Sequence, residues 1–125
     1  MVNIHHDSTE WLKYWDGNKS SEEYRKYTDF WKQLADYMKD EPEQVCFETI
    51  NEPTFTEGDA LAKLDEINRA AYDAIRATGG NNETRMIVFP TRVTKFEEGE
   101  PLYNFIKELD DENVIATVHY YSEWV

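Results

Sequence analysis

The stretch CFETINEPTF, residues 46–55, decides how the rest of the chain is interpreted. It continues a short apolar run, QVCFETI (44–50), whose β-branched and aromatic residues are typical of a buried strand. Pro53 has no N–H with which to continue a strand ladder, so we expect the strand to end there. Asn51 and Glu52 then lie at the carboxyl end of a strand, where parallel-sheet enzymes hold their reactive groups.

The segments on either side alternate short apolar runs with stretches of helical periodicity. Further strands are predicted at VNIHH (2–6), RMIVFP (85–90) and NVIATVHYY (113–121), and helices at about 21–39, 59–77 and 101–109. The first helix is expected to begin with a capping box formed by Ser20 and Glu23. Strands that alternate with helices imply right-handed crossovers and a parallel sheet. We therefore predict one α/β domain over residues 1–125, and a small doubly wound sheet would satisfy the pattern alone.

Composition narrows the range of partners and says little about the compartment. Acidic side chains outnumber basic ones by 26 to 13, and the resulting formal charge of -13 argues against nucleic acid or an anionic membrane as a partner. Aromatic residues make up 14% of the chain, which is compatible with stacking on sugar rings. The single cysteine, Cys46, cannot form an internal disulfide and fits a small core residue. No apolar run approaches a membrane span, and the N-terminal MVNIHHD resembles no signal peptide.

Polar residues gather at the predicted strand ends. His5 and His6 follow the first strand, Asn51 and Glu52 the second, and His119 the last. Since the carboxyl ends of parallel strands share one edge of a sheet, this placement favours a functional site. Strand alternation also predicts that the Glu48 and Glu52 side chains point to the same interior.

The residues alone leave three interpretations of Glu52 open. It would be a general acid if partial burial raised the pKa of its carboxyl toward neutrality. It would be a metal ligand if it joined His5, His6, Asp7 and His119, but neighbouring strand residues point to opposite faces and no zinc-motif spacing occurs. It would be an ordinary solvated acid in a turn if neither applied. We predict no metal and no cofactor.

Four motifs taken together resemble glycoside hydrolase family 5, and most closely its endo-β-1,4-glucanases (cellulases). They are NIHHD (3–7), FETINEP (47–53), IRATGGNNETRMIVFPT (75–91) and HYYSEW (119–124). The resemblance implies a partial (β/α)8 TIM barrel, in which about four parallel strands and three helices correspond to the third to sixth strands of the family fold.

The resemblance also implies roles for individual residues. Glu52 matches the acid/base of a retaining mechanism, which uses two carboxylates about 5–5.5 Å apart, and Asn51 matches the residue that holds the sugar 2-hydroxyl. The other matching residues are expected to bind substrate or support the carboxylates; they are His5, His6, His119, Tyr121 and Trp124. Packing against the barrel wall is an equal alternative for Trp124. Trp11 and Trp15 are expected to pack rather than to form a sugar platform.

The chain also departs from the family pattern. No segment matches the seventh strand with its nucleophilic Glu, the eighth strand with its cleft Trp, or the first two strands with their Arg. We therefore expect a fragment that carries the acid without the nucleophile and is inactive alone on its β-1,4-glucan substrate. A homodimer, or the missing strands, would complete the barrel. The alternatives are a fragment of a mannanase or other β-glycanase, and a non-catalytic self-assembling or glycan-binding module. The family implies secretion.

Overall fold

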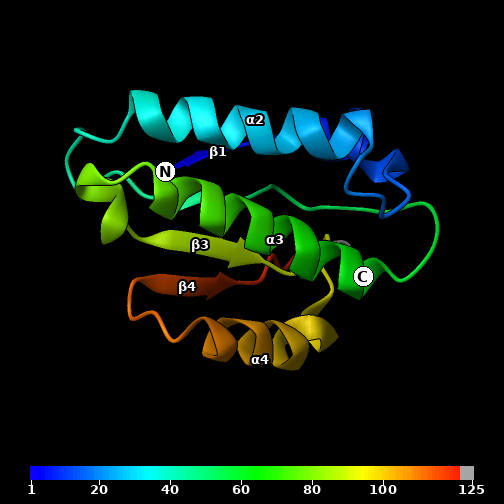
Figure 1. Ribbon diagram of the computed structural model, residues 1–125. Helices are drawn as coiled ribbons and strands as arrows, with labels where there is room; N and C mark the ends of the chain where they lie inside the picture. The colour runs from blue at the N-terminus through cyan, green and yellow to red at the C-terminus, as the bar shows by residue number, and fades with distance from the viewer. Residues whose placement is uncertain (122–125) are drawn as a thin grey trace.

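The computed structural model describes residues 1–121, in which short strands alternate with helices (Figure 1). The strands are β1 (Val2–Asn3), β2 (Phe47–Glu48), β3 (Ile87–Pro90) and β4 (Val114–Thr117). The α-helices are α1 (Asp7–Glu10), α2 (Glu22–Tyr37), α3 (Ala60–Ala77) and α4 (Gly99–Leu109), and single 3-10 turns are η1 (Leu12–Tyr14), η2 (Gly80–Glu83) and η3 (Phe96–Glu98). The predicted order is confirmed, and α1 and η1 add short helical turns between β1 and α2. Among residues 1–121, no helix combines the length and the apolarity needed to cross a membrane.

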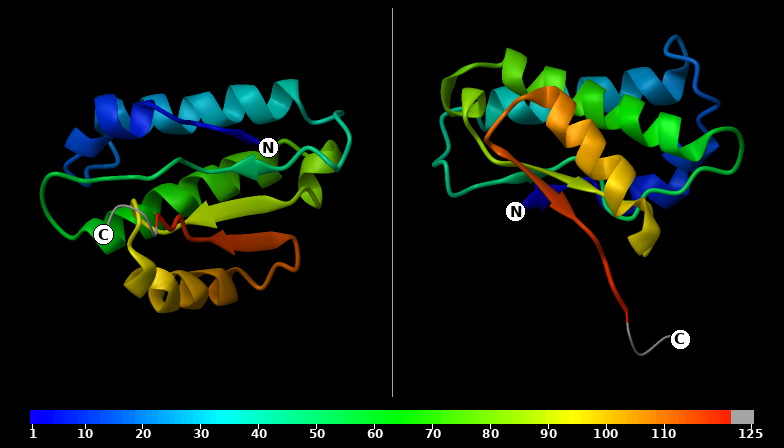
Figure 2. Two further views of the ribbon diagram at one scale, coloured as in Figure 1. Left: turned by 180° about the vertical axis from the view of Figure 1, so that it is seen from behind. Right: turned by 90° about the horizontal axis from the view of Figure 1, so that it is seen from below.

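All four strands are parallel, and their spatial order, β1-β2-β3-β4, is their order in the chain. One row of paired residues crosses the sheet through Asn3, Glu48, Val88 and Ile115. Helices α2, α3 and α4 cover one face, and the right-hand view of Figure 2 shows the strands on the other side of that helix layer. Parallel strands in chain order, with the helices on one face, are the arrangement predicted for part of a (β/α)8 barrel.

Helix α2 begins one residue later than the predicted capping box. Its N-cap is Ser21, whose Oγ accepts the backbone N–H of Tyr24 at 3.2 Å. The predicted box of Ser20 and Glu23 is wrong because the N–H of Ser20 is bonded to Oδ1 of Asn18 (2.9 Å), which holds Ser20 in the preceding turn. An Asx interaction therefore competes with the cap and shifts the helix start.

Helix α3 spans nearly the predicted range. Oδ1 of its N-cap, Asp59, accepts the N–H of Ala62 at 3.0 Å. Gly79 follows the helix with a φ of 71°, a conformation that a side chain would strain, so a glycine ends the helix.

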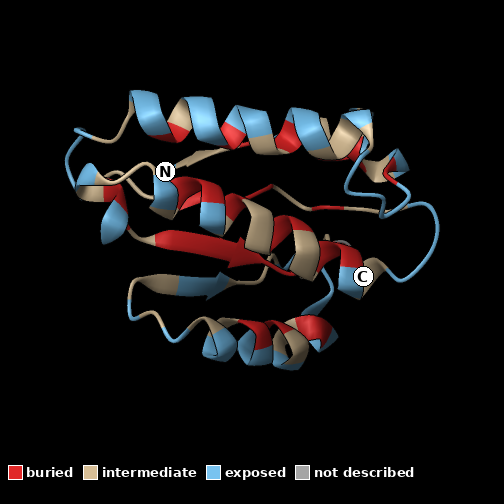
Figure 3. Ribbon diagram, in the orientation of Figure 1, coloured by how far each residue is buried: buried red, intermediate tan, exposed pale blue. Residues whose placement is uncertain are grey.

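The core lies between the sheet and the helices. Figure 3 shows buried residues on β3 and along the sheet-facing sides of α2 and α3. Tyr27 and Trp31 of α2 are fully buried, and both donate to the backbone carbonyl of Thr49, at 3.0 and 3.1 Å. The Thr49 hydroxyl donates to Oδ1 of Asn68 on α3 at 2.7 Å. Both helices are thus tied to the backbone just before Asn51.

Regular strand pairing is shorter than predicted. β2 keeps two residues of the predicted 44–50, and β4 keeps four of 113–121. Backbone bonding nevertheless continues past β2: the N–H of Thr49 donates to the carbonyl of Val88 (3.1 Å) and that of Asn51 to the carbonyl of Ile4 (2.8 Å). The chain therefore stays attached to its neighbours while it turns out of strand geometry toward the site.

A fully buried arginine closes the opposite end of the sheet. The Arg85 guanidinium donates to the backbone carbonyls that follow α2, those of Met38, Glu41, Pro42 and Val45, at 2.6–3.0 Å. It also donates to Oδ1 of Asn82 and lies over the Phe47 ring. One side chain thereby joins four carbonyls at the end of α2 and in the following turn, and those of Met38 and Pro42 also accept backbone N–H groups.

We expect Arg85→Met to lower the free energy of unfolding by about 3–5 kcal/mol, because a fully buried side chain loses its hydrogen bonds to four carbonyls and to Asn82 at once. Urea unfolding followed by tryptophan fluorescence measures this change. The matched control is Arg25→Met on the exposed side of α2, for which we expect less than about 0.5 kcal/mol. Equal effects of the two substitutions would contradict the role assigned to Arg85.

Candidate functional site

The predicted site residues follow the carboxyl ends of three strands. His5 follows β1, Asn51 and Glu52 follow β2, and His119 and Tyr121 follow β4. In Figure 1 the β3 and β4 arrows point toward the end of the sheet where these segments emerge. Parallel pairing therefore places residues from distant parts of the chain at one edge.

Glu52 is the point at which the β2 and β4 segments meet. Its Oε1 accepts a hydrogen bond from the Tyr121 hydroxyl at 2.5 Å and lies 2.9 Å from Nδ1 of His119. The side chains of Glu52 and His119 are both 26% exposed, so the carboxyl is held firmly while it remains accessible. An ionised carboxylate only accepts hydrogen bonds, so this contact requires a proton on Nδ1.

The backbone at Glu52 differs from the strand geometry assumed in the prediction. Its φ is 41°, in the left-handed region that non-glycine residues seldom adopt. The alternation argument does not extend to Glu52, although both Glu48 and Glu52 do lie against His119. Backbone strain of this kind is found at functional sites, where surrounding contacts maintain it.

Among the three interpretations of Glu52, the one in which partial burial raises the pKa of its carboxyl is not supported by the contacts within residues 1–121. The hydrogen bond from Tyr121 lowers the pKa of this carboxyl below its usual 4.5, and the bond from His119 acts in the same direction. Partial burial opposes them but is the weaker effect, and the nearby His5 also favours the charged form. The same bond raises the pKa of Tyr121, because the neighbouring carboxylate disfavours a phenolate. Two donors outweigh desolvation at a group that is still open to water.

A second carboxylate lies on the other side of His119. Glu48 is 1% exposed, and its Oε2 accepts a hydrogen bond from Nδ2 of Asn3 at 2.7 Å. Its Oε1 lies 3.8 Å from Nε2 of His119. The role of Asn3 was missed from the sequence, and the available signal was its place directly before IHHD, where β1 pairs with the FETINEP strand.

The remaining predicted residues are less closely joined to Glu52. The His5 and His6 rings are exposed and meet edge to face at 4.9 Å. The Asn51 side chain is half-buried beside Glu52, and its backbone is bonded to Ile4. Trp124 lies outside the described residues.

The loop tryptophans mainly pack, as expected. Trp15 is 1% exposed and contacts the Tyr24 and Phe55 rings, so it cannot form a sugar platform. Trp11 is half-buried, donates to Asp7 at 2.5 Å and lies under the ammonium of Lys26.

The His, Cys, Asp and Glu side chains of residues 1–121 include no group of three or more that could hold a metal ion. The contacts of Glu52 are hydrogen bonds to a hydroxyl and an imidazole. The arrangement can therefore hold an ionised carboxyl group at the sheet edge while leaving it open to water.

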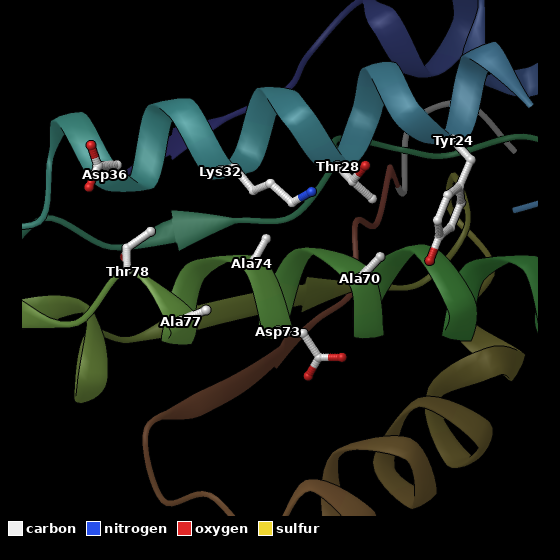
Figure 4. A pocket seen from close by; sticks show the side chains of 9 residues that line it. All are labelled: Tyr24, Thr28, Lys32, Asp36, Ala70, Asp73, Ala74, Ala77 and Thr78. Atoms are coloured by element: carbon white, nitrogen blue, oxygen red, sulfur yellow. The ribbon is translucent and has the colours of Figure 1, made fainter. Parts of the chain in front are cut away.

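Two of the hollows in the described surface lie at different places. A groove of about 640 Å³ runs between α2 and α3, and Figure 4 shows its side chains. They are Tyr24, Thr28, Lys32, Asp36, Ala70, Asp73, Ala74, Ala77 and Thr78. None follows a strand end, so this groove is separate from Glu52. The other hollow, of about 540 Å³, is lined by Phe96, Val118 and Tyr120, and the last two flank His119 in the chain.

The family model described as Cellulase (glycosyl hydrolase family 5) matches residues 1–125. The chain belongs to glycosyl hydrolase family 5. Endoglucanase B of Paenibacillus lautus is 36% identical over 99% of this chain and 23% of its own length. The curated relative is thus about four times as long as the matched segment.

Solved family 5 structures share the fold. The tri-modular endo-β-1,4-glucanase B of Bacillus halodurans superposes with a TM-score of 0.88 at 37% identity, over 99% of this chain and 24% of that one. A xyloglucan-specific endo-β-1,4-glucanase from a metagenomic library, solved with cellotriose, gives 0.76 at 31% identity over 98% and 38%. The predicted family and the predicted partial barrel are both confirmed.

The lowered pKa of Glu52 makes a prediction about stability and pH. Because the folded carboxyl has a pKa below 4.5, its contribution is present above about that pH and is lost as the pH falls through the folded value. We expect Glu52→Gln to remove part of the acid-induced loss of stability, which urea unfolding at neutral pH and near pH ~3 measures. Glu83→Gln, an exposed control on η2, should leave the wild-type pH dependence intact. A pH dependence that Glu52→Gln leaves unchanged would contradict the assigned contacts.

Proposed function

We propose that Glu52 is the general acid/base of a retaining β-1,4-glucanase and that residues 1–125 supply this half of its active site. The observation that carries the proposal is the Glu52 carboxyl, fixed by Tyr121 and His119 at the strand ends of a family 5 fold. The named relatives are endoglucanases, and one solved relative holds cellotriose. The proposed substrate, a β-1,4-glucan chain, is a polymer too large to enter a cell. We therefore propose that the enzyme acts outside the cell.

The neighbouring residues would bind the sugar chain. Asn51 precedes Glu52 and would reach the 2-hydroxyl of the sugar whose bond is cleaved. His5 and His6 are exposed at the adjoining strand end and would line the cleft. Trp124 is proposed to line it as well.

Retaining hydrolysis needs a second carboxylate about 5–5.5 Å from the first. Glu48 is unsuited to that role because it is 1% exposed, is bonded to Asn3 and lies behind His119. We propose that the nucleophile comes from outside residues 1–125. A second negative charge at that distance would also raise the pKa of Glu52 and allow it to hold the proton that an acid catalyst donates.

The 125-residue polypeptide should therefore show no turnover of carboxymethylcellulose. A chimeric protein in which residues 1–125 replace the matching segment of the Bacillus halodurans glucanase should be active. In that chimera Glu52→Gln should lower kcat roughly 10²–10⁴-fold, because the leaving oxygen loses its proton donor. Reducing-sugar release measures both rates.

Glu83→Gln in the same chimera is the control and should retain full activity. Turnover by the polypeptide alone would show that residues 1–125 contain a nucleophile. An active chimera that tolerates Glu52→Gln would show that Glu52 is not the acid/base.

The isolated polypeptide is also proposed to self-associate. Its β4 edge exposes Ile115 (45%) and Ala116, and β1 at the other edge is only half-buried. Pairing of two copies would supply eight strands and cover the face that carries Val88 and Ile115. Sedimentation equilibrium at micromolar concentration should give twice the monomer mass, and a compact monomer would contradict this proposal.

A further inference from the structure

Glu48 is a buried acid that takes no direct part in the hydrolysis proposed for Glu52. A carboxylate that is 1% exposed is costly unless hydrogen bonds or charges compensate for its lost hydration. Asn3 satisfies Oε2. Within residues 1–121, no hydrogen-bond donor reaches Oε1, which faces Nε2 of His119 at 3.8 Å.

His119 therefore lies between two carboxylates. Its Nδ1 contacts Oε1 of Glu52 at 2.9 Å, and its Nε2 faces Oε1 of Glu48. If Nε2 lacked a proton, its lone pair would face a buried acceptor, which is a repulsive arrangement. With a proton on Nε2 the same contact becomes attractive, either directly or through one bridging water.

The proton on one imidazole nitrogen is commonly set by the partner of the other. We infer that Glu48 is a positioning residue that keeps a proton on Nε2 of His119; this rests on the function proposed for Glu52. With Glu52 ionised, as described above, Nδ1 donates to that carboxyl while Nε2 faces Glu48, so each ring nitrogen carries a proton toward one of the two carboxylates.

This arrangement favours one orientation of the His119 ring. Turning the ring over would carry Nε2 away from Oε1 of Glu48, which no other donor within residues 1–121 approaches. Asn3 fixes the far oxygen of Glu48, so the chain of contacts runs from β1 through β2 to β4. Three strands thus contribute to the placement of one proton.

The test is ¹⁵N NMR of the histidine rings in the 125-residue polypeptide at neutral pH, with the His119 signals assigned by His119→Asn. We expect the wild type to show a protonated Nε2. In Glu48→Gln the amide group can still accept from Asn3 and can donate to Nε2, so we expect the Nε2 proton to be lost while Nδ1 stays protonated. Glu98→Gln, at another buried acid, should leave the His119 signals unchanged.

A wild-type ring without a proton on Nε2 would overturn the inference, and this arm needs no variant to fold. A Glu48→Gln spectrum identical to that of the wild type would also overturn it. Neither result touches the role of Glu52, which the chimera measures independently. Conversely, an active chimera that tolerates Glu52→Gln would contradict the function proposed for Glu52 and would leave the measured proton on Nε2 unaffected.

Discussion

Parallel pairing of consecutive strands is the constraint on which the rest of this structure depends. Each connection must return across the sheet, and the returning segments become α2, α3 and α4 on one face. The carboxyl ends of the strands then fall at one edge whatever the intervening sequence. Glu52 and Tyr121, 69 residues apart in the chain, share a hydrogen bond because of this topology.

The two ends of the sheet have different roles. At one end Arg85 binds the carbonyls that follow α2 and needs no access to solvent. At the other end Glu52 keeps a conformation with positive φ and remains partly open to water. Between them, the Thr49 carbonyl joins α2 to the β2 backbone just before that conformation begins. A rigid base therefore supports a strained, accessible carboxyl.

Much of this could be predicted from the sequence, for physical reasons. The spacing of the apolar residues predicted α2 and α3, and the alternation of strands with helices predicted the parallel sheet. The position of Pro53 predicted the end of the β2 segment. The predicted capping box is wrong because the Asn18 side chain accepts a hydrogen bond from the N–H of Ser20. Residue spacing does not reveal this local competition. The direction of the pKa shift at Glu52 could not be predicted, because it depends on donors from the segment that follows β4. Nothing in the NEP motif alone shows that Tyr121 reaches Glu52.

The contact between Glu48 and His119 lay equally beyond sequence reasoning. Alternation placed Glu48 on the interior side of the strand, but its contacts with Asn3 and His119 come from the register of neighbouring strands. The match to family 5 shows the family and the fold. It leaves the protonation of each side chain to be derived from these contacts.

The central claim is that donors from the β4 segment hold Glu52 as a carboxylate at the sheet edge. The most direct test is the pKa of the Glu52 side chain, measured by ¹³C NMR of its carboxyl carbon in the wild type and in Tyr121→Phe. The account predicts a wild-type pKa below 4.5 and a higher value in Tyr121→Phe, with no change in the exposed control Tyr120→Phe. A wild-type pKa at or above 4.5, unmoved by Tyr121→Phe, would contradict it.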